Sequence, residues 1–452
     1  MYIKGKSVLV VGLGTSGIPT VEVLLSLGAK VSCYDKKSKE ELTGILGKID
    51  MENVELIAGE FPEDIMKFDI VVLSPGIPTD LPFIQKARAK NICIIGELEL
   101  AYRLCEGLFI AITGTNGKTT TTALIGEIFK KAQKETHIVG NIGIAAISKA
   151  RKATKDAVMV TEVSSFQLES VVDFKPHIAT ILNVTPDHLN RHKTMENYID
   201  AKANIFKNQD ENDFLVLNMD NDMSYELKNR TNSQVILFSR KNEVSRGAYV
   251  LGDAIVVKEE NESPKTICKV DELKIPGNHN LENALAAVVI TYWSGIDIEI
   301  ISDTLKSYMG VEHRIEFVEE INGIRFINDS KGTNPDASIK AIEAMKTPIV
   351  LIAGGMDKGS DFNEFMHAFN GKVRHMVLIG QTAEKIKRTA KENDFESVTI
   401  VNNMEEAVNC AYDIAKHGDV ILLSPACASW DMYKSFEIRG KHFKECTASL
   451  RR

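Results

Sequence analysis

Short apolar runs alternate with amphipathic stretches along most of the chain. The runs at 7–11, 70–74, 108–113 and 349–353 are five or six residues long and dominated by Val, Ile, Leu and Ala. Apolar runs of this length, separated by stretches with helical spacing, predict buried parallel strands joined by helices. Strands are expected at 7–11, 30–34, 70–74, 108–113, 157–162, 178–184, 349–353, 373–379, 398–401 and 420–424, and helices at 18–27, 196–206, 283–292 and 405–416.

The rhythm changes between about residues 214 and 276. Here Ala248–Leu251 and Ala254–Lys258 flank Gly252-Asp253, a dipeptide suited to a tight hairpin turn. We therefore expect an antiparallel annex to a central, otherwise parallel sheet. From about residue 311 onward the pattern again predicts parallel βα units.

The chain has 452 residues, enough for about three domains of roughly 150 residues each. The changes in pattern place the joints near Gly96 and Gly310. We accordingly expect α/β domains at 1–96, 97–310 and 311–452.

Composition and charge exclude several classes of protein. The formal net charge is −8, so the chain lacks the basic footprint of a nucleic-acid binder. Its seven cysteines are scattered without a CxxC pair, which predicts reduced thiols rather than disulfides or a zinc site. Uncharged stretches such as the one between Glu282 and Asp297 are too short to span a bilayer. We expect a soluble, cytoplasmic, monomeric protein that acts on small molecules, with neither a nucleic-acid partner nor membrane insertion.

The first of two glycine-rich loops is Gly12–Gly17, with the sequence GLGTSG. It follows a predicted strand and precedes a predicted helix, and Asp35 ends the next strand, where a ribose-binding acid would lie. Glycines let the backbone approach a pyrophosphate, and the helix N-terminus stabilises its charge. Alone, this loop favours a nicotinamide-dependent oxidoreductase. It also suits any other nucleoside diphosphate, and a tight turn without a ligand is the structural alternative.

The second loop is Gly114–Thr120, with the sequence GTNGKTT, between a predicted strand and a predicted helix. Such a loop cradles phosphates with backbone N–H groups, while Lys118 reaches phosphate oxygens and the Thr119 hydroxyl can ligate Mg²⁺. The usual spacing would place a glycine at 112, but Ile112 is there and the glycine is at 114. A triphosphate loop in a second domain is unusual for a dehydrogenase. It fits an ATP-driven enzyme whose substrate carries a nucleotide.

The motifs that follow the second loop extend over the rest of the chain and resemble the Mur ligase family. They occur in family order, and together with the loop at 12–17 they span all three expected domains: GTNGKTT at 114–120, Glu162 in TEVSSFQLE, NVTPDH at 183–188, Lys202 in DAKANIF, GNHNLEN at 277–283, His313-Arg314, NDSKGTNP at 328–335 and SPACAS at 424–429.

The resemblance implies a fold and an activity. The fold would be an N-terminal Rossmann-like parallel sheet that binds a UDP-substrate, a central P-loop ATPase-like sheet with the annex, and a C-terminal Rossmann-like domain that binds an amino acid and closes on ATP. The activity would be ATP-dependent amide formation through an acyl phosphate. The first loop and the last motifs most resemble the member that adds D-glutamate to UDP-N-acetylmuramoyl-L-alanine during peptidoglycan precursor synthesis.

Three alternatives remain at this point. The nearest is a sibling ligase that adds another amino acid, although the DNPR motif of the diaminopimelate-adding sibling is absent. The others are the nicotinamide-dependent oxidoreductase suggested by the first loop and a non-catalytic ATP-binding switch.

The resemblance assigns residues to ATP and metal. ATP would be bound by Gly114, Thr115, Asn116, Gly117, Lys118, Thr119, Thr120, His279, Asn280, Asn283, Arg314 and Asp329. Two Mg²⁺ ions, which prefer oxygen ligands, would be held by Thr119, Glu162, His188 and Lys202. A lone histidine is often a structural residue, and imidazole is not a favoured Mg²⁺ ligand, so the role of His188 depends on the resemblance. An asparagine at a helix start is also a common cap, which is the alternative for Asn280 and Asn283.

Lys202 would be carbamylated by CO₂, which turns a cation into an anion with two oxygens. Carbamylation requires the neutral amine, so a lowered pKa would favour it. Without the resemblance, a lysine in the helix expected at 196–206 would be a solvated surface charge.

The resemblance also assigns substrate-binding and catalytic residues. The UDP-substrate would contact Gly14, Thr15, Ser16, Asp35, Lys37, Ser74, Pro75, Gly76, Asn141 and His188. D-Glutamate would contact Lys331, Thr333, Lys358, Ser429 and Phe436. A dicarboxylate needs cations and hydroxyl donors, which Lys358 and Ser429 supply, whereas Phe436 equally fits a core. The residues expected to take part in catalysis are Lys118, Glu162, His188, Lys202 and Arg314.

Overall fold

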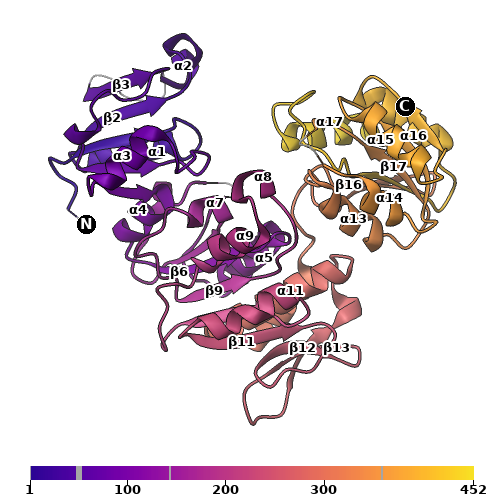
Figure 1. The fold of residues 1–452 in the computed structure, drawn as a ribbon. Helices are drawn as coiled ribbons and strands as arrows, with labels where there is room; N and C mark the ends of the chain where they lie inside the picture. The colour runs from indigo at the N-terminus through magenta and orange to yellow at the C-terminus, as the bar shows by residue number, and fades with distance from the viewer. Residues whose placement is uncertain (1, 47–52, 142–143, 358–359, 452) are drawn as a thin grey trace. The chain divides into compact units, whose positions relative to one another are not determined.

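The computed structural model describes residues 2–46, 53–141, 144–357 and 360–451 (Figure 1). Its strands form three sheets of five, nine and six strands. The chain divides into two compact units, Met1–Val270 with Glu282–Leu305, and Asp271–Leu281 with Lys306–Arg452. The first unit holds the first two sheets, and the second unit holds the third.

The first sheet is parallel throughout, in the order β3-β2-β1-β4-β5 that is typical of a Rossmann half. Both faces of its central strand β1 are covered: Val8 and Val10 lie in one core cluster, and Leu9 and Val11 in another. Burial on both faces explains the uninterrupted apolar run. The elements are β1 Ser7–Val11, α1 Gly17–Ser26, β2 Lys30–Asp35, α2 Lys39–Leu46, β3 Val54–Ala58, η2 Ile65–Lys67, β4 Ile70–Leu73, α3 Pro82–Ala89 and β5 Cys93–Gly96.

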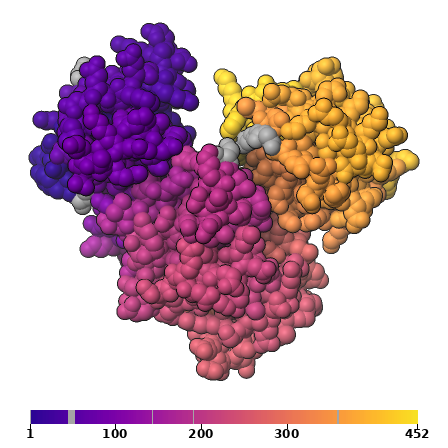
Figure 2. Space-filling view, viewed as in Figure 1, coloured from indigo at the N-terminus to yellow at the C-terminus, as the bar shows by residue number. Residues whose placement is uncertain are grey.

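The second sheet has the order β14-β13-β12-β11-β10-β9-β6-β8-β7. Its strands are β6 Leu108–Thr113, β7 Thr136–Gly140, β8 Val158–Glu162, β9 Ile178–Ile181, β10 Phe214–Asn218, β11 Gln234–Ser239, β12 Gly247–Leu251, β13 Ala254–Lys258 and β14 Lys265–Lys269. Strands β6 to β12 run parallel, and β13 and β14 add antiparallel pairs. The expected hairpin annex is therefore confirmed, and it lies at the end of this sheet away from the indigo N-terminal strands (Figures 1 and 2).

The connections of the second sheet bring three strand ends together. Strand β6 lies between β8 and β9, so the segments after these three strands leave from one edge. In sheets of this kind, ligands bind at the carboxyl ends of the strands. The helices from here to residue 307 are α4 Glu97–Leu104, α5 Lys118–Lys131, α6 Ile147–Ala150, α7 Ser165–Leu168, α8 Leu189–His192, α9 Met195–Ala203, α10 Asp222–Tyr225, η3 Glu226–Arg230, η4 Val270–Glu272, α11 Asn278–Trp293 and α12 Ile298–Ser307.

The third sheet has the order β15-β16-β20-β17-β18-β19. Its strands are β15 Glu316–Ile321, β16 Ile324–Asn328, β17 Ile349–Ala353, β18 Val373–Leu378, β19 Val398–Ile400 and β20 Val420–Leu423, and its helices are α13 Pro335–Ala344, α14 Asn363–His367, α15 Ala383–Glu392, α16 Met404–Ile414 and α17 Phe436–Ser449. Alternate residues of β17 enter two core clusters, with Leu351 in one and Val350 and Ile352 in the other. In the ranges given above, no helix combines the length and the apolar composition that crossing a bilayer requires.

The expected α/β fold, with its parallel N-terminal sheet, mixed central sheet and C-terminal sheet, is confirmed. One detail was wrong, because the residues after 311 do not start with a parallel unit: β15 pairs antiparallel with β16. The turn between them is Asn322-Gly323, with φ values of 51° and 73°, and Asn-Gly favours this kind of hairpin. Helix α11 also begins at Asn278 instead of 283. The domain boundaries at 96 and 310 stay a prediction.

Candidate active site

The loop at 114–117 joins β6 to α5 and contains most of the residues expected to bind phosphate. Gly117 has φ of 84°, and a Cβ atom there would collide with Oδ1 of Asn283. Asn183, which follows β9, holds the loop from the other side. Its Oδ1 accepts a hydrogen bond from the backbone N–H of Asn116 at 2.9 Å, and its Nδ2 donates to the Asn116 carbonyl at 3.1 Å. Asn183 belongs to a recognised motif, but sequence reasoning gave it no role.

Lys118 and Lys202 meet at one carbonyl of this loop. Nζ of Lys118 donates to the oxygens of Gly114 and Thr115 at 2.9 and 2.7 Å, and Nζ of Lys202 donates to the Gly114 oxygen at 2.8 Å. Thr119 and Thr120, which follow Lys118 in α5, are also buried. The structure thus brings both lysines to the phosphate loop, although they are 84 positions apart in the sequence.

Lys202 is almost fully buried, with only 1% of its surface exposed. Its Nζ lies 4.5 Å from the ring centroid of Tyr198, whose hydroxyl is 3.2 Å from Oγ1 of Thr115. Burial lowers the pKa of Lys202 well below its ordinary value, the Lys118 ammonium lowers it further, and Asp187 opposes the shift. The solvated surface lysine that was the alternative is therefore not what the structure contains.

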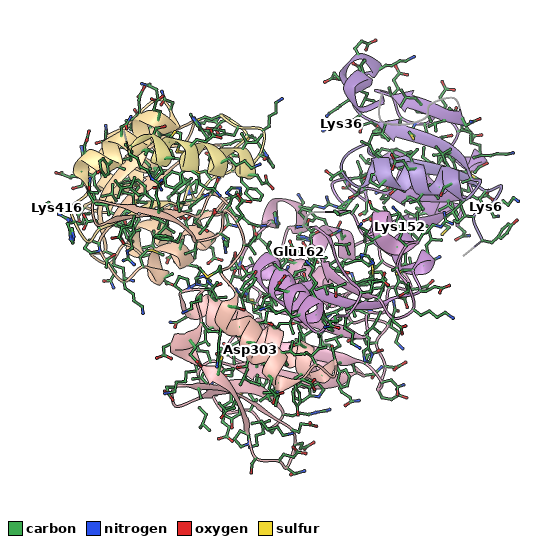
Figure 3. The ribbon with its side chains drawn as sticks, turned by 180° about the vertical axis from the view of Figure 1, so that it is seen from behind. Lys6, Lys36, Lys152, Glu162, Asp303 and Lys416 are labelled. Atoms are coloured by element: carbon green, nitrogen blue, oxygen red, sulfur yellow. The ribbon has the colours of Figure 1, made fainter. Side chains whose placement is uncertain are left out.

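Glu162 ends strand β8 and is 3% exposed (Figure 3). The backbone N–H of Asn141 donates to its carbonyl at 2.8 Å, and Nδ2 of Asn141 donates to Oε1 at 3.0 Å. The other carboxylate oxygen, Oε2, is buried and has no hydrogen-bond partner within the described part of the chain. A buried carboxylate oxygen without a donor suits a hard cation.

The four residues expected to hold metal do not form a ready-made cluster of acids and histidines. No group of three or more His, Cys, Asp or Glu side chains placed to hold a metal occurs among the residues described. Thr119 lies at the start of α5, Glu162 ends β8, and Lys202 reaches the Gly114 carbonyl. Metal binding here would therefore need further oxygen ligands besides these side chains, which a bound phosphate or a carbamate could provide.

His188 comes directly before α8, in a left-handed conformation with φ of 55°. Its ring packs against Phe166 with centroids 4.9 Å apart, and its side chain is 46% exposed. Nε2 of His188 lies 3.5 Å from Oδ2 of Asp187. The neighbouring His192 is buried, and its Nε2 lies 2.9 Å from Oγ of Ser165. His188 is therefore accessible to a ligand at the edge where β9 ends.

The first glycine-rich loop, which follows β1, is hydrogen-bonded to residues at the ends of β2 and β4, the strands on either side of β1. Ser74, after β4, donates through Oγ to the Gly12 carbonyl at 2.9 Å. Asp35, at the end of β2, accepts hydrogen bonds from the backbone N–H groups of Leu13 at 2.9 Å and Lys37 at 3.0 Å. The expected ribose-binding acid thus holds the glycine-rich loop with Oδ2 and the segment that follows β2 with Oδ1.

The other residues expected near the UDP-substrate surround this loop or lie at the second sheet. Gly14, Thr15, Lys37 and Gly76 are exposed, and Ser16 and Pro75 are half-buried. A Cβ atom on Gly14 would meet no atom within 4 Å, so the backbone is open to a ligand at that point. Asn141 and His188 lie at the edge of the second sheet, as described above. Lys36, labelled in Figure 3, is exposed beside Lys37.

In the second unit, Asp329 follows β16 and is completely buried. Oγ of Ser424 donates to its Oδ2 at 2.7 Å, and Nη1 of Arg314 lies 3.7 Å from its Oδ1. Burial raises the pKa of Asp329 to about 6, and Arg314 opposes this shift. Arg314 and Asp329, both expected to reach ATP, are therefore a pair.

His279 and Asn280 lie in the first turn of α11 and belong to the second unit. Burial, and after it the charges of Arg314 and Lys340, lower the pKa of His279 to about 3, so its ring is neutral. Nδ2 of Asn280 donates to the Pro276 carbonyl at 2.7 Å. Asn283 belongs to the first unit, where its Oδ1 accepts from Oγ1 of Thr121 at 3.2 Å.

Two of the loops expected to bind D-glutamate are joined through a residue that sequence reasoning missed. Arg439, 1% exposed, donates to Oγ and to the carbonyl of Ser330 at 3.0 and 2.8 Å and to the Cys427 carbonyl at 3.2 Å. It therefore connects the loop that carries Lys331 and Thr333 to the one that carries Ser429. The only sequence signal for Arg439 was its place three residues after Phe436.

Two of these side chains also meet directly, because Nζ of Lys331 lies 5.1 Å from the ring centroid of Phe436. Thr333 is half-buried and Ser429 is buried. Lys358 lies outside the described residues.

Comparisons with known proteins give matches along the whole chain. Family models match at three places: the Mur ligase MurD-like N-terminal domain at residues 6–96, the Mur ligase middle domain at 112–291, and the Mur ligase glutamate ligase domain at 313–427. The chain is 56% identical over 455 residues to UDP-N-acetylmuramoylalanine--D-glutamate ligase of Alkaliphilus oremlandii (strain OhILAs), with 100% of both chains covered.

Solved structures show the same fold. UDP-N-acetylmuramate-alanine ligase from Thermotoga maritima matches with a TM-score of 0.62 and 20% identity, covering 98% of this chain and 100% of that one. The MurF ligase from Thermotoga maritima in complex with ADP matches with a TM-score of 0.59 and 15% identity, covering 99% and 96%. At such identities these structures bear on the fold alone, and they share its three-sheet α/β architecture.

Proposed function

The chain belongs to the Mur ligase family, and we propose that it joins D-glutamate to UDP-N-acetylmuramoyl-L-alanine in peptidoglycan precursor synthesis. The observation that carries this proposal is the 56% identity, over both whole chains, with a relative named for that reaction. The phosphate loop at 114–120 and the buried carboxylate of Glu162 supply the chemistry that an ATP-dependent ligase needs.

Amide formation needs an activated carboxylate, because an oxide is a poor leaving group. A carboxylate oxygen of the substrate attacks the γ-phosphorus of ATP, the bond to the β-phosphate oxygen breaks, and ADP leaves. The amine of D-glutamate then attacks the acyl carbon, inorganic phosphate leaves, and the nitrogen loses a proton. Since little of this requires covalent help, the enzyme contributes charge neutralisation and alignment.

The residues around the Gly114 carbonyl are assigned to the nucleotide. Lys118 would neutralise β- and γ-phosphate charge, with the backbone N–H groups of the loop around it. Thr119 and Glu162 would hold Mg²⁺ on the phosphates, which is supported by the buried Oε2 of Glu162, an atom that no described residue hydrogen-bonds. Bound Mg²⁺ would draw negative charge from the transferred phosphoryl group. Arg314, paired with Asp329, would add positive charge from the second unit.

A second Mg²⁺ is assigned to His188 and to a carbamate on Lys202. The neutral Nζ of Lys202 attacks the carbon of CO₂, a nitrogen–carbon bond forms, and a proton is released. The burial of Lys202 and its lowered pKa support this assignment, since only the neutral amine reacts. The carbamate provides the oxygens that the lysine itself lacks.

The substrates are assigned to the two ends of the chain. The loops at 12–17 and 74–76, with Asp35, Lys37 and Asn141, would bind the UDP-substrate, and Lys331, Thr333, Ser429 and Phe436 would bind D-glutamate. We further propose that the domain expected at 311–452 closes on ATP and that the protein is a monomer. Small-angle scattering with and without nucleotide and substrates tests both, and identical profiles would count against closure.

The decisive experiment measures product formation across amino acids. Purified protein with ATP, Mg²⁺ and UDP-N-acetylmuramoyl-L-alanine should release phosphate with D-glutamate but not with L-lysine, and mass spectrometry should detect the amide. Phosphate release with L-alanine and UDP-N-acetylmuramic acid, but not with D-glutamate, would overturn the choice of amino acid. ATP hydrolysis without an amide, or stoichiometric NAD binding without UDP-sugar binding, would overturn the class of enzyme.

A further inference from the structure

Arg191 lies in the short helix α8, among the segments that follow strands of the second sheet. It contacts the turn that follows β4 of the first sheet. Its Nη2 donates to the backbone carbonyl of Ile77 at 3.2 Å and to Oε2 of Glu169 at 2.6 Å. The side chain of Arg191 is 20% exposed and that of Glu169 is 21% exposed, so the ion pair is mostly removed from water. A charge-assisted bond of this length with little solvent around it fixes the guanidinium in place.

The same guanidinium also lies over an aromatic ring. Its central carbon is 4.3 Å from the ring centroid of Phe166, and this ring also packs against His188 at 4.9 Å and His192 at 5.4 Å. Arg191 therefore contacts, through Phe166, the histidine assigned to metal. Only a planar cation with several donors can stack on a ring while its edge binds a carboxylate and a carbonyl.

The carbonyl that Arg191 holds belongs to a turn that continues into the first glycine-rich loop. The N–H of Ile77 donates to the Ser74 carbonyl at 3.0 Å, and Oγ of Ser74 donates to the Gly12 carbonyl at 2.9 Å. A displacement of Ile77 is thereby passed to Ser74 and Gly12. Three hydrogen bonds thus connect Arg191 to the loop assigned to the UDP pyrophosphate.

We propose that Arg191 is a positioning residue that holds the turn at 74–77 in register with the segment at 183–188. It would keep the UDP-bound end of the substrate at a fixed distance from the centre where its carboxylate is phosphorylated. This role rests on the proposed function, since that function assigns a UDP-substrate to one segment and metal to the other. Arg191 itself need not touch the substrate.

The test compares Arg191→Met and Arg191→Lys with Arg151→Met. Nη1 of Arg151 donates to Oγ of Ser26 at 2.9 Å, so it also joins residues of the first sheet's domain to the second, but away from both segments. We expect both Arg191 variants to raise the KM for the UDP-substrate by about 10- to 100-fold, the scale of a small misplacement in a site. The KM for ATP should change by less than about twofold, because the phosphate loop is untouched. Arg151→Met should leave both constants unchanged.

Thermal unfolding and a second variant distinguish a loss of positioning from a loss of folding. Glu169→Gln keeps the arginine but removes its charged partner, and it should raise the same KM even if Arg191→Met does not fold. Equal rises in both KM values together with a lower Tm, or an unchanged KM for the UDP-substrate, would overturn the positioning role. A wild-type protein that forms no D-glutamate-dependent product would overturn the proposed function instead.

Discussion

Asn141 holds one carboxylate oxygen of Glu162 and leaves the other without a partner in the described ranges. Nδ2 of Asn141 donates to Oε1 at 3.0 Å, while Oε2 is buried. The contact joins the carboxyl ends of the paired strands β7 and β8. An outer partner that orients one oxygen of a carboxylate commonly prepares the other for a metal.

Removing this partner should weaken metal binding more than it weakens the fold. We expect Asn141→Ala to raise the Mg²⁺ concentration for half-maximal phosphate release by about 10- to 100-fold. The matched control is Asn402→Ala, since Nδ2 of Asn402 also donates to a glutamate, Glu406, at 3.0 Å but on the surface. Equal Mg²⁺ dependence in the two variants would contradict the role of Asn141.

Lys202→Ala and Lys202→Arg should both be nearly inactive, with a loss of at least about 100-fold, because neither side chain can carry a carbamate. Added formate should partly restore Lys202→Ala, since the truncated side chain leaves room for a small carboxylate. It should not restore Lys202→Arg, whose guanidinium occupies that room. Phosphate release at a series of formate concentrations measures this, and full activity of either variant without formate would rule out the carbamate.

Two glycine substitutions should differ in their effects on stability and on ligand binding. Gly117→Ala requires a left-handed alanine that collides with Asn283, so we expect a loss of about 1–3 kcal/mol of stability and of nucleotide binding. Gly14→Ala meets nothing within 4 Å and should leave the Tm unchanged while weakening UDP-substrate binding. Calorimetric titration with ATP and with UDP-substrate separates the two effects. Loss of ATP binding in Gly14→Ala would contradict the assignment of the loops.

Glu97, at the start of α4, should make stability depend on pH. One of its oxygens accepts the Ile147 N–H at 2.7 Å, and burial raises its pKa from 4.5 to about 7. Between these values the native state holds a proton that the unfolded state has lost, so stability falls as pH rises through this window and then levels off. The free energy of unfolding of the non-titrating variant Glu97→Gln should therefore rise relative to that of the wild type between pH 5 and pH 8, by at most about 3 kcal/mol.

Urea unfolding midpoints at pH 5 and pH 8 measure this difference, with Glu106→Gln as the exposed control. A difference between Glu97→Gln and the wild type that stays constant with pH would show that Glu97 does not titrate in this window.

Arg439→Lys should affect D-glutamate more than ATP. A lysine keeps the charge but cannot reach Ser330 and Cys427 together, so the two loops that Arg439 joins would separate. We expect the KM for D-glutamate to rise about tenfold or more, with a smaller change for ATP. Arg451→Lys, at an exposed ion pair with Glu319, is the control. Equal changes for both substrates would indicate general destabilisation.

Much of the fold could be predicted because burial on both faces leaves a plain signal. Strands such as Ile349–Ala353 are apolar at every position and were bounded correctly from sequence. The hairpin of β15 and β16 was missed although Asn322-Gly323 marks its turn, because its outer strand, EFVEEI, is half polar and lacks that signal. A strand with one face exposed to solvent has fewer apolar positions, so it is harder to recognise from the sequence.

The site was less predictable, because its contacts join distant positions. The phosphate loop could be found from its own glycines and Lys118. The burial of Lys202 could not, since only the fold brings its helix to the Gly114 carbonyl. Arg191 and Arg439 each bind a backbone carbonyl, which every residue type possesses, and their side-chain partners Glu169 and Ser330 are distant in the sequence, so no local motif points to them.

The three-way contact of Arg191 also has a consequence for ancestry. Glu169 and Phe166 depend on the same guanidinium, and a mostly buried carboxylate that loses its cation is costly. A relative in which Arg191 alone is replaced would lose stability. Replacements at 191 and 169 should therefore occur together among relatives. Arg151 donates to a serine hydroxyl on the surface, so its replacement should not depend on a change at another position. The two arginines should therefore differ in how they vary among relatives.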